Sequence, residues 1–223
     1  MIRRLLTITG LVMSAVMLAS CTASAEAPSE QSNAEETAAA VTESETEDTA
    51  VSSEASDTTD ITESGADTLV VVFSCTGTTK GVADRIADVT DADLYEIVPA
   101  VPYTEEDRDW NDDNSRCTVE QSDADVRPEI GSDPVDIDGY EVIFIGYPIW
   151  FGEEPRIMDT FVESYDFGDT TVIPFCTSGS SDIGSSGTNL AANAGSGNWL
   201  EGKRFDGDVS ADELTEWIES LGL

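Results

Sequence analysis

The 223-residue sequence contains no histidine and only 10 lysines and arginines, against 46 aspartates and glutamates. Without histidine, the chain lacks the usual general base near neutral pH and the commonest nitrogen ligand of metals. Ser-His-Asp hydrolysis and histidine-bound zinc are therefore excluded. The net charge of −36 disfavours a surface for nucleic acid or anionic lipid, so a charged partner should be basic.

Cysteine pairs of the metal-binding and redox types are also missing. The four cysteines, Cys21, Cys75, Cys117 and Cys176, form no CxxC motif. Zinc ribbons, thioredoxin-type sites and cysteine-held iron–sulfur clusters therefore lack support.

The N-terminal segment has the form of an export signal. Arg3 and Arg4 precede an apolar run over residues 5–18, shorter than the ~20 residues that a membrane-spanning helix needs. The run ends in Leu18-Ala19-Ser20-Cys21, which resembles the lipobox of bacterial lipoproteins. The resemblance implies that residues 1–20 are a lipoprotein signal peptide and that Cys21 is lipidated, anchoring the protein outside the cytoplasmic membrane or in a periplasm. An ordinary secretory signal is the alternative.

Residues 22–67 contain 13 acidic residues, no basic residue and no aromatic one. This Ala/Ser/Thr/Glu-rich composition cannot bury enough apolar area to offset the entropy lost on ordering. We predict that residues 21–67 are a disordered tether, extended by charge repulsion. One folded domain remains, over residues 68–223, with 33 acidic and 8 basic residues and a net charge of −25.

Apolar runs and helical patterns alternate along this domain. Strands are expected at 69–73, 94–98, 142–145 and 171–175, although Pro174 argues against hydrogen bonding on both sides of the last one. Helices are expected after Thr78 and Thr79, which can cap an N-terminus, and over 155–165 and 211–221, where Ser210 and Glu213 can form a capping box. The alternation predicts an α/β, three-layer, doubly wound parallel sheet, with ligands beyond the carboxyl ends of its strands.

Three loops at strand ends are therefore candidate binding segments. The first loop, Ser74-Cys75-Thr76-Gly77-Thr78-Thr79, can surround a phosphate with hydroxyl and backbone N–H donors at a helix start. It is neither a Walker A loop nor a GxGxxG motif. Read alone, it could equally be a Ser/Thr-rich helix cap.

The second loop, Gly146-Tyr147-Pro148-Ile149-Trp150-Phe151-Gly152, is apolar and aromatic where loops are normally polar, which suggests a platform for a flat ring. We expect Trp150 to face the ligand; the alternative is that Trp150 or Phe151 packs on the following helix as core. The third loop, Cys176-Thr177-Ser178-Gly179-Ser180-Ser181-Asp182, offers donors for the polar edge of a heterocycle. Together the three loops describe a flavin mononucleotide (FMN) site.

At these residues the chain resembles the flavodoxin-like proteins, in particular bacterial ones with a GYPIWWG-type loop. The resemblance implies a five-stranded sheet of order 2-1-3-4-5, whose short fifth strand is residues 202–205. It also implies a cofactor-binding set for FMN. The set comprises Ser74, Cys75, Thr76, Gly77, Thr78 and Thr79 around the phosphate, Pro148, Ile149, Trp150, Phe151 and Gly152 against the ring, and Thr177, Ser178, Gly179 and Asp182 at its edge.

The sequence departs from the family pattern at three positions: Phe151 replaces a tryptophan, and Ser180 and Asp182 replace glycines. A positive φ at Asp182 would be costly, and its carboxylate near the flavin would lower the flavin potential.

The connection over residues 99–138 is long enough to be functional. It is expected to form a partial lid with Trp110 stacking on the flavin, or else a surface helix pair with Trp110 in a satellite core. Cys75, Cys117 and Cys176 are expected to be free thiols.

The leading hypothesis is an FMN-binding, membrane-tethered electron carrier or flavin-dependent oxidoreductase, whose acidic surface steers a basic redox partner. The first alternative is an NAD(P)H-dependent reductase of quinones or other small acceptors. The second is a non-redox surface binding module with a degenerate flavin site. In each case the membrane is contacted through the lipid anchor only, and nucleic acid is not a partner.

Overall fold

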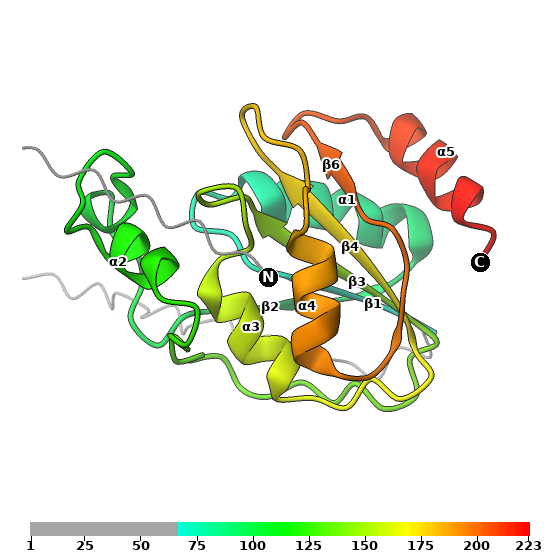
Figure 1. Ribbon diagram of the computed structural model, residues 1–223. Coiled ribbons are helices and arrows are strands. Elements are labelled where there is room, and N and C mark those ends of the chain that lie inside the picture. Colours follow the sequence, from blue (N-terminus) through cyan, green and yellow to red (C-terminus); the bar gives the residue numbers. More distant parts are fainter. Residues whose placement is uncertain (1–66) are drawn as a thin grey trace, which may run out of the picture. The chain divides into compact units, whose positions relative to one another are not determined.

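The computed structural model describes residues 67–223, and the predictions for the signal peptide, Cys21 and the tether lie outside this range. Figure 1 shows the arrangement of its strands and helices. The strands are β1 (Thr68–Val72), β2 (Asp93–Glu96), β3 (Val142–Pro148), β4 (Thr171–Thr177), β5 (Asn198–Trp199) and β6 (Lys203–Phe205). The helices are α1 (Thr78–Thr90), η1 (Glu106–Arg108), α2 (Arg116–Ser122), α3 (Arg156–Glu163), α4 (Ser186–Ala194) and α5 (Ala211–Leu221). No helix in this range is long and apolar enough to span a bilayer.

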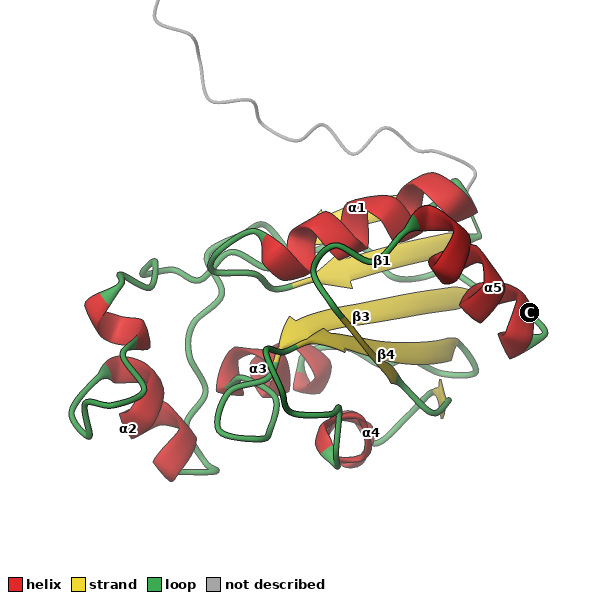
Figure 2. Cartoon of the chain, turned by 90° about the horizontal axis from the view of Figure 1, so that it is seen from above, coloured by secondary structure: helices red, strands yellow, loops and turns green. Residues whose placement is uncertain are grey.

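The named strands of the described sheet all pair in parallel. Their order is β2-β1-β3-β4-β5, with β6 beside β4. Figure 2 shows α1 and α5 on one face of the sheet, and α3 and α4 on the other. The predicted three-layer α/β fold is confirmed.

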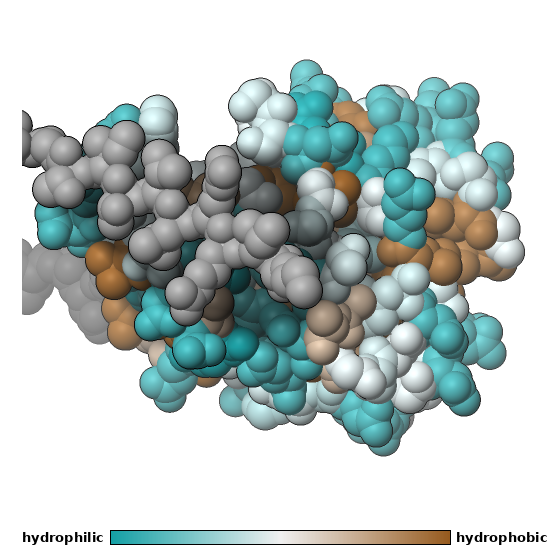
Figure 3. Space-filling model, in the orientation of Figure 1, coloured by the Kyte–Doolittle hydropathy of each residue, from teal (hydrophilic) through white to brown (hydrophobic). Residues whose placement is uncertain are grey.

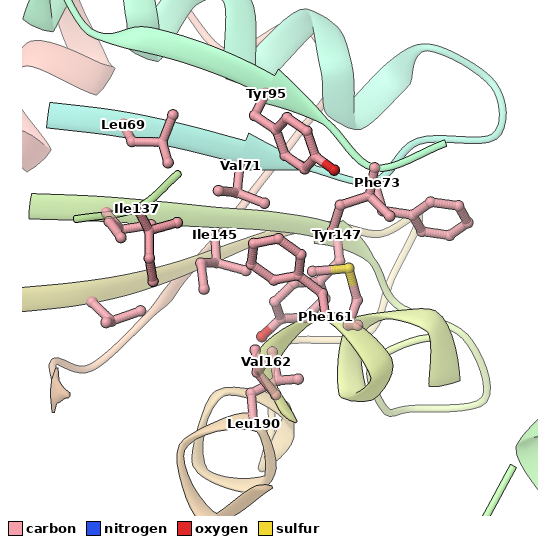
Figure 4. Packing of buried hydrophobic residues seen from close by; sticks show 14 of the residues in the cluster. Leu69, Val71, Phe73, Tyr95, Ile137, Ile145, Tyr147, Phe161, Val162 and Leu190 are labelled. Atoms are coloured by element: carbon pink, nitrogen blue, oxygen red, sulfur yellow. The ribbon is translucent and has the colours of Figure 1, made fainter. Parts of the chain in front are cut away.

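β1 is apolar and buried from Leu69 to Val72 because it lies inside the sheet. Successive side chains of a strand point to opposite faces, and here both faces are covered by helices. Val70 and Val72 pack in the core beneath α1 and α5. Leu69 and Val71 pack in the opposite core, with Phe161 and Leu190 of α3 and α4 (Figure 4).

The fifth strand is not the continuous one expected at 202–205. Two short strands take its place, because β5 pairs with Thr171–Val172 and β6 pairs with the end of β4. The Leu200 N–H donates to the Val172 carbonyl on this edge, so Pro174, two residues later, faces the same edge without an N–H to offer. A side chain at 202 would also meet the Pro174 carbonyl at 2.6 Å, which explains the glycine there.

The two predicted helix caps have different outcomes. At α5, Ser210 Oγ accepts a hydrogen bond from the Glu213 N–H at 3.2 Å, which is one half of the expected capping box. At α1, the N-cap is Gly77 rather than Thr78 or Thr79, and no side chain caps the helix. The N–H groups of the first turn of α1 are therefore open to a ligand.

The insertion between β2 and β3 carries η1 and α2. An antiparallel bridge between Pro99 and Ile130 closes its base. Both ribbon views place α2 beyond the carboxyl ends of the central strands (Figures 1 and 2). The insertion thus lies on the side of the sheet where the three candidate loops emerge.

Candidate functional site

The first loop joins β1 to α1 and presents donors that have no internal partner. Gly77 has a φ of 81°, a conformation that glycine adopts at no steric cost, and it turns the chain into the helix. Ser74 Oγ is buried and has no hydrogen-bond partner among the described residues. A helix N-terminus without a side-chain cap, together with an unpartnered hydroxyl, is the donor set of an anion site.

Hydroxyl contacts connect the first loop with the third. Thr79 Oγ1 and Thr177 Oγ1 are 2.8 Å apart and buried, and Thr76 and Thr78 contact each other at 3.2 Å. Lys80 is directed away from the loop, because its Nζ donates to Asp84 at 2.7 Å. The loop therefore presents neutral donors.

The second loop ends in a tight turn that displays an aromatic side chain. Trp150 and Glu153 exchange two backbone hydrogen bonds, at 2.9 and 3.0 Å. The two central residues, Phe151 and Gly152, have φ values of 52° and 85°. Positive φ at both positions is the pattern of a type I′ turn, which favours Asn-Gly rather than Phe-Gly. The turn therefore holds Phe151 in a strained conformation, and the residue is 53% exposed.

We expect Phe151→Gly to raise the free energy of unfolding by about 1 kcal/mol, because the left-handed region costs a residue with a β-carbon about that much. Denaturant unfolding of the 67–223 domain measures the change. Asp91→Gly is the matched control, since Asp91 has the same φ of 52° at the end of α1, away from the turn. The control should gain less, because aspartate tolerates this region better than phenylalanine. If Phe151→Gly destabilises the domain instead, packing of the Phe151 ring stabilises the fold by more than the positive φ costs.

Trp150 is partly buried and packs against the core cluster that includes residues of α3, as one of the two expectations had it, and it has close aromatic neighbours. Its ring packs edge-on against Phe73 and Tyr103, with centroids 5.7 and 5.1 Å apart. Tyr103 belongs to the insertion, where the Arg116 guanidinium lies 3.8 Å from its ring centroid. The alternative in which Trp150 or Phe151 packs on the following helix as core is wrong for Phe151, which is exposed.

Gln121 of α2 ties the insertion to the second loop. Its side-chain amide donates to the carbonyls of Trp150 and Glu154, at 3.3 and 3.0 Å, and accepts from the Arg156 N–H at 3.2 Å. Trp110 is 71% exposed, so the alternative that places it in a satellite core is wrong. The insertion therefore contacts the second loop, and its role as a lid stays a prediction.

The third loop is braced from within. Ser178 Oγ accepts from the N–H groups of Ser180 and Ser181, and the Ser178 carbonyl accepts from Arg204 at 2.7 Å. The expected cost at Asp182 does not arise, since Asp182 has no positive φ. Its carboxylate instead accepts from the Ile183 N–H at 2.8 Å.

The loops surround two adjoining pockets of about 240 and 470 Å³. Both are lined by Thr76, Thr78, Pro148, Ile149, Trp150 and Thr177. We call the smaller one the insertion-side pocket; it is also lined by Ser74, Cys75, Thr79, Arg108, Trp110, Cys117 and Phe151. The larger one, the sheet-edge pocket, is also lined by Ser178, Gly179, Asp206, Gly207 and Asp208.

Twelve of the fifteen expected cofactor-binding residues therefore line one pocket or both. Gly77, Gly152 and Asp182 line neither. The carboxylates at the pocket wall are those of Asp206 and Asp208 instead of Asp182. The sequence analysis missed Asp206, Asp208 and Arg108 as pocket residues, because no local motif marks them. For Arg108, the one available signal was that the chain has few basic residues.

The three cysteines of the domain are free thiols, as expected. Burial raises the pKa of Cys75 from 9.0 to about 12, although Arg108 and Arg116 oppose the shift. Burial, and then the charge of Asp182, raises the pKa of Cys176 to about 12 as well. Both thiols are protonated at neutral pH and are weak nucleophiles.

We expect iodoacetamide at pH 8 to alkylate Cys75 and Cys176 far more slowly in the folded domain than after unfolding. A rise of about three pKa units reduces the reactive thiolate about a thousandfold. Mass spectrometry of time points measures the modification at each cysteine. Rapid alkylation of folded Cys75 would contradict the raised pKa, and Cys75→Ser confirms which thiol reacts.

A parallel sheet of this order, with an open helix start at the end of β1 and an aromatic loop at the end of β3, defines a protein of the flavodoxin-like class. The chain belongs to the flavodoxin family, because the family model described as Flavodoxin matches residues 67–221.

Solved structures agree with this assignment. A chain from Bacteroides eggerthii DSM 20697 is 42% identical, with a TM-score of 0.66 over 70% of this chain and 98% of that one. A chain from Bacteroides uniformis ATCC 8492 is 44% identical, with a TM-score of 0.66. The match covers 70% of this chain and 99% of that one. A flavoprotein from Lactobacillus acidophilus NCFM in complex with FMN is 24% identical, with a TM-score of 0.51 over 68% and 97%, and shows the shared fold. No curated protein matches.

The two Bacteroides chains support treating the described domain as a unit. They are matched over nearly their whole length by about 70% of this chain, the share that residues 67–223 represent. Residues 67–223 can therefore be studied by themselves.

Proposed function

We propose that the domain binds FMN and that the protein transfers electrons through it, as a carrier or as a flavin-dependent oxidoreductase. The observation that carries the proposal is the buried, unpartnered Ser74 hydroxyl beside the uncapped start of α1, at the edge of an aromatic-lined pocket. Membership of the flavodoxin family supports it. The FMN complex of the Lactobacillus flavoprotein names the same cofactor for a protein of this fold.

The residues present fit FMN at both of its ends. A phosphate needs hydrogen-bond donors, and the first loop supplies hydroxyls and N–H groups and contains no acidic residue of its own. Pro148, Ile149 and Trp150 form an apolar wall common to both pockets, suited to a flat ring and to the exclusion of water. The polar third loop offers donors and acceptors for the ring edge.

Bound FMN would supply the redox chemistry, and the residues of the chain would set its position and surroundings. Ser74 and the start of α1 would hold the phosphate. The contact between Thr79 and Thr177 fixes the first loop against the third, so the phosphate and ring ends of the site keep a constant separation. Asp206 and Asp208 place negative charge beside the sheet-edge pocket, which disfavours added negative charge on a ring bound there.

An absorbance spectrum after gel filtration tests the proposal. The 67–223 domain is incubated with FMN, separated from free flavin, and scanned in the visible range. Retained flavin bands are expected, followed by reversible bleaching during anaerobic reduction. A colourless protein would overturn both redox functions and favour the binding module without flavin.

We further propose that the protein is exported and anchored to the outer side of the cytoplasmic membrane through lipidated Cys21. The support is the apolar run ending in the Leu18–Cys21 motif and the acidic segment after it. The face seen in Figure 3 is mostly hydrophilic, and the domain carries a net charge of −25, which would steer a basic redox partner. Membrane fractionation tests the anchor, because Cys21→Ala should release the protein from the membrane fraction.

A further inference from the structure

The insertion contains a hydrogen-bonded tyrosine and glutamate that line neither pocket and that the proposed function does not use. Tyr103 donates its phenol O–H to Glu120 Oε2 at 2.6 Å, and Glu120 is 9% exposed. The other carboxylate oxygen of Glu120 accepts from Arg116 Nε, also at 2.6 Å. Burial, and then the hydrogen bond to Glu120, raise the pKa of Tyr103, so its phenol carries a proton at neutral pH. We call Tyr103 and Glu120 the tyrosine–glutamate pair.

Aromatic side chains connect the tyrosine–glutamate pair with the pockets. The centroids of the Tyr103 and Trp150 rings are 5.1 Å apart, and Trp150 lines both pockets. Phe73 is buried and packs edge-on against both rings, with centroid distances of 5.9 Å to Tyr103 and 5.7 Å to Trp150. Tryptophan and tyrosine are among the side chains most easily oxidised by one electron. Because the Tyr103 and Trp150 rings are in contact, an electron can pass directly between them.

The charges around Tyr103 determine how it can be oxidised. The Arg116 guanidinium lies 3.8 Å from the centroid of its ring, and a cation at that distance opposes positive charge on the ring. Tyr103 must therefore lose its proton together with an electron. Glu120 already accepts a hydrogen bond from that proton and can take it up without rearrangement. Because Glu120 is also the ion-pair partner of Arg116, its carboxylate releases the proton again when the electron returns.

We propose that Tyr103 is a redox-active tyrosine that supplies one electron, through Trp150, to an oxidant in the pockets while Glu120 takes up its proton. The oxidant is FMN excited by visible light, so the proposal rests on the proposed function. Trp150 gives one electron to the excited ring, and Tyr103 then gives one electron to Trp150. The Tyr103 O–H bond breaks, its proton passes to Glu120, and a neutral tyrosyl radical remains. Return of the electron and the proton restores each group, so the excited ring is discharged without net chemistry.

Transient absorption of the FMN-loaded 67–223 domain after a pulse of blue light tests the proposal. The absorption band of a tyrosyl radical is expected to appear as the band of a tryptophan radical decays. Tyr103→Phe should abolish the tyrosyl band and leave the tryptophan band, and Trp150→Phe should abolish the tyrosyl band because phenylalanine does not relay the electron. Glu120→Gln should slow the appearance of the tyrosyl radical about a hundredfold, the scale expected when a positioned proton acceptor is lost.

Tyr140→Phe is the matched control, because Tyr140 also donates to a carboxylate, that of Asp93 at 2.8 Å, but lines neither pocket. It should behave as the wild type does. Absence of a tyrosyl band in the wild type, or an equal effect of Tyr103→Phe and Tyr140→Phe, would overturn the proposal.

The wild type also supplies a test that does not depend on the folding of a variant. The tyrosyl radical should form more slowly in heavy water than in ordinary water, because the phenol O–H bond breaks as the electron leaves. Equal rates in the two solvents would show that the proton does not move with the electron, and would overturn the role of Glu120.

Failure of the proposed function is visible separately, since the wild-type domain would then retain no flavin. In that case azide radicals produced by pulse radiolysis are used to oxidise the tryptophans of the flavin-free domain, and the later electron transfer from tyrosine to tryptophan is followed. A first-order tyrosyl signal that Tyr103→Phe reduces and Tyr140→Phe does not reduce supports a redox-active Tyr103. No tyrosyl signal, or equal losses in the two variants, overturns it.

Discussion

Replacing Ser74 with alanine is expected to weaken FMN binding about 10- to 100-fold while leaving the flavin-free domain as stable as before, or more stable by up to about 1 kcal/mol. The two effects have opposite signs because Ser74 Oγ is buried without a partner among the described residues. In the flavin-free domain its removal costs no hydrogen bond and relieves an unsatisfied polar group. With FMN bound, the same hydroxyl would donate to a charged phosphate, and such bonds are stronger than neutral ones.

Fluorescence titration of FMN with the 67–223 domain measures the affinity, and denaturant unfolding of the flavin-free domain measures the stability. Ser164→Ala is the matched control, since Ser164 Oγ donates to the Thr160 carbonyl at the end of α3 and lines neither pocket. It should leave FMN binding unchanged. Equal FMN affinity for Ser74→Ala and the wild type would show that the hydroxyl does not contact the phosphate.

The position of the first loop was predictable because the strand before it and the helix after it are both marked by local sequence patterns. A continuous apolar run such as Val70–Val72 is typical of a strand covered on both faces, and a single glycine follows it before a helical pattern. The structure adds that Gly77 itself caps α1 and that the threonines do not. That detail depends on backbone conformation, which the residue types alone leave open.

The arrangement of the second loop was not predictable, because its partners come from distant segments. Trp150 packs against Tyr103, 47 positions earlier, and Gln121 of the insertion hydrogen-bonds to its carbonyl. Nothing in the sequence near either residue indicates these contacts. The division of the edge strand into β5 and β6 was predictable only in part. Pro174 shows that β4 lacks one backbone N–H donor. The strand order decides which neighbouring strand loses that hydrogen bond.

A buried charged cluster behind the second loop was also missed. Glu154 and Asp159 are each 1% exposed, and Arg156 lies between them, 3.8 Å from Glu154 and 3.5 Å from Asp159. Asn189 and Asn193 of α4 donate to the two carboxylates, at 3.2 and 2.8 Å. Two buried carboxylates and one buried guanidinium leave one excess negative charge, unless a carboxylate takes up a proton.

Burial raises the pKa of Glu154 from 4.5 to about 7, with the charge of Asp159 adding to the shift, and Asn189 and Arg156 opposing it. Burial likewise raises the pKa of Asp159. The folded domain therefore holds a proton on Glu154 at pH values where the unfolded chain has released it. Stability from this group is complete below pH 4.5 and is lost as the pH rises to about 7.

Glu154→Gln is accordingly expected to stabilise the domain at pH 8, by up to about 3 kcal/mol, and to have little effect at pH 4.5. Glutamine keeps an oxygen for the Asn189 amide but carries no charge, and Arg156 retains Asp159 and Glu153 as ion-pair partners. Denaturant unfolding at a series of pH values measures the difference. The slope of stability against pH should become flatter between 4.5 and 7, although Asp159 leaves part of it in place.

Glu216→Gln on the exposed side of α5 is the matched control and should shift the stability little at any pH. A loss of more than about 1 kcal/mol for Glu154→Gln at pH 8 would show that Glu154 is ionised in the folded state and stabilises Arg156 as a partner. The flatter slope would instead establish a proton that the domain binds near neutral pH. Because Glu154 follows directly after the turn that carries Trp150 and Phe151, that proton would stabilise the base of the loop that lines both pockets.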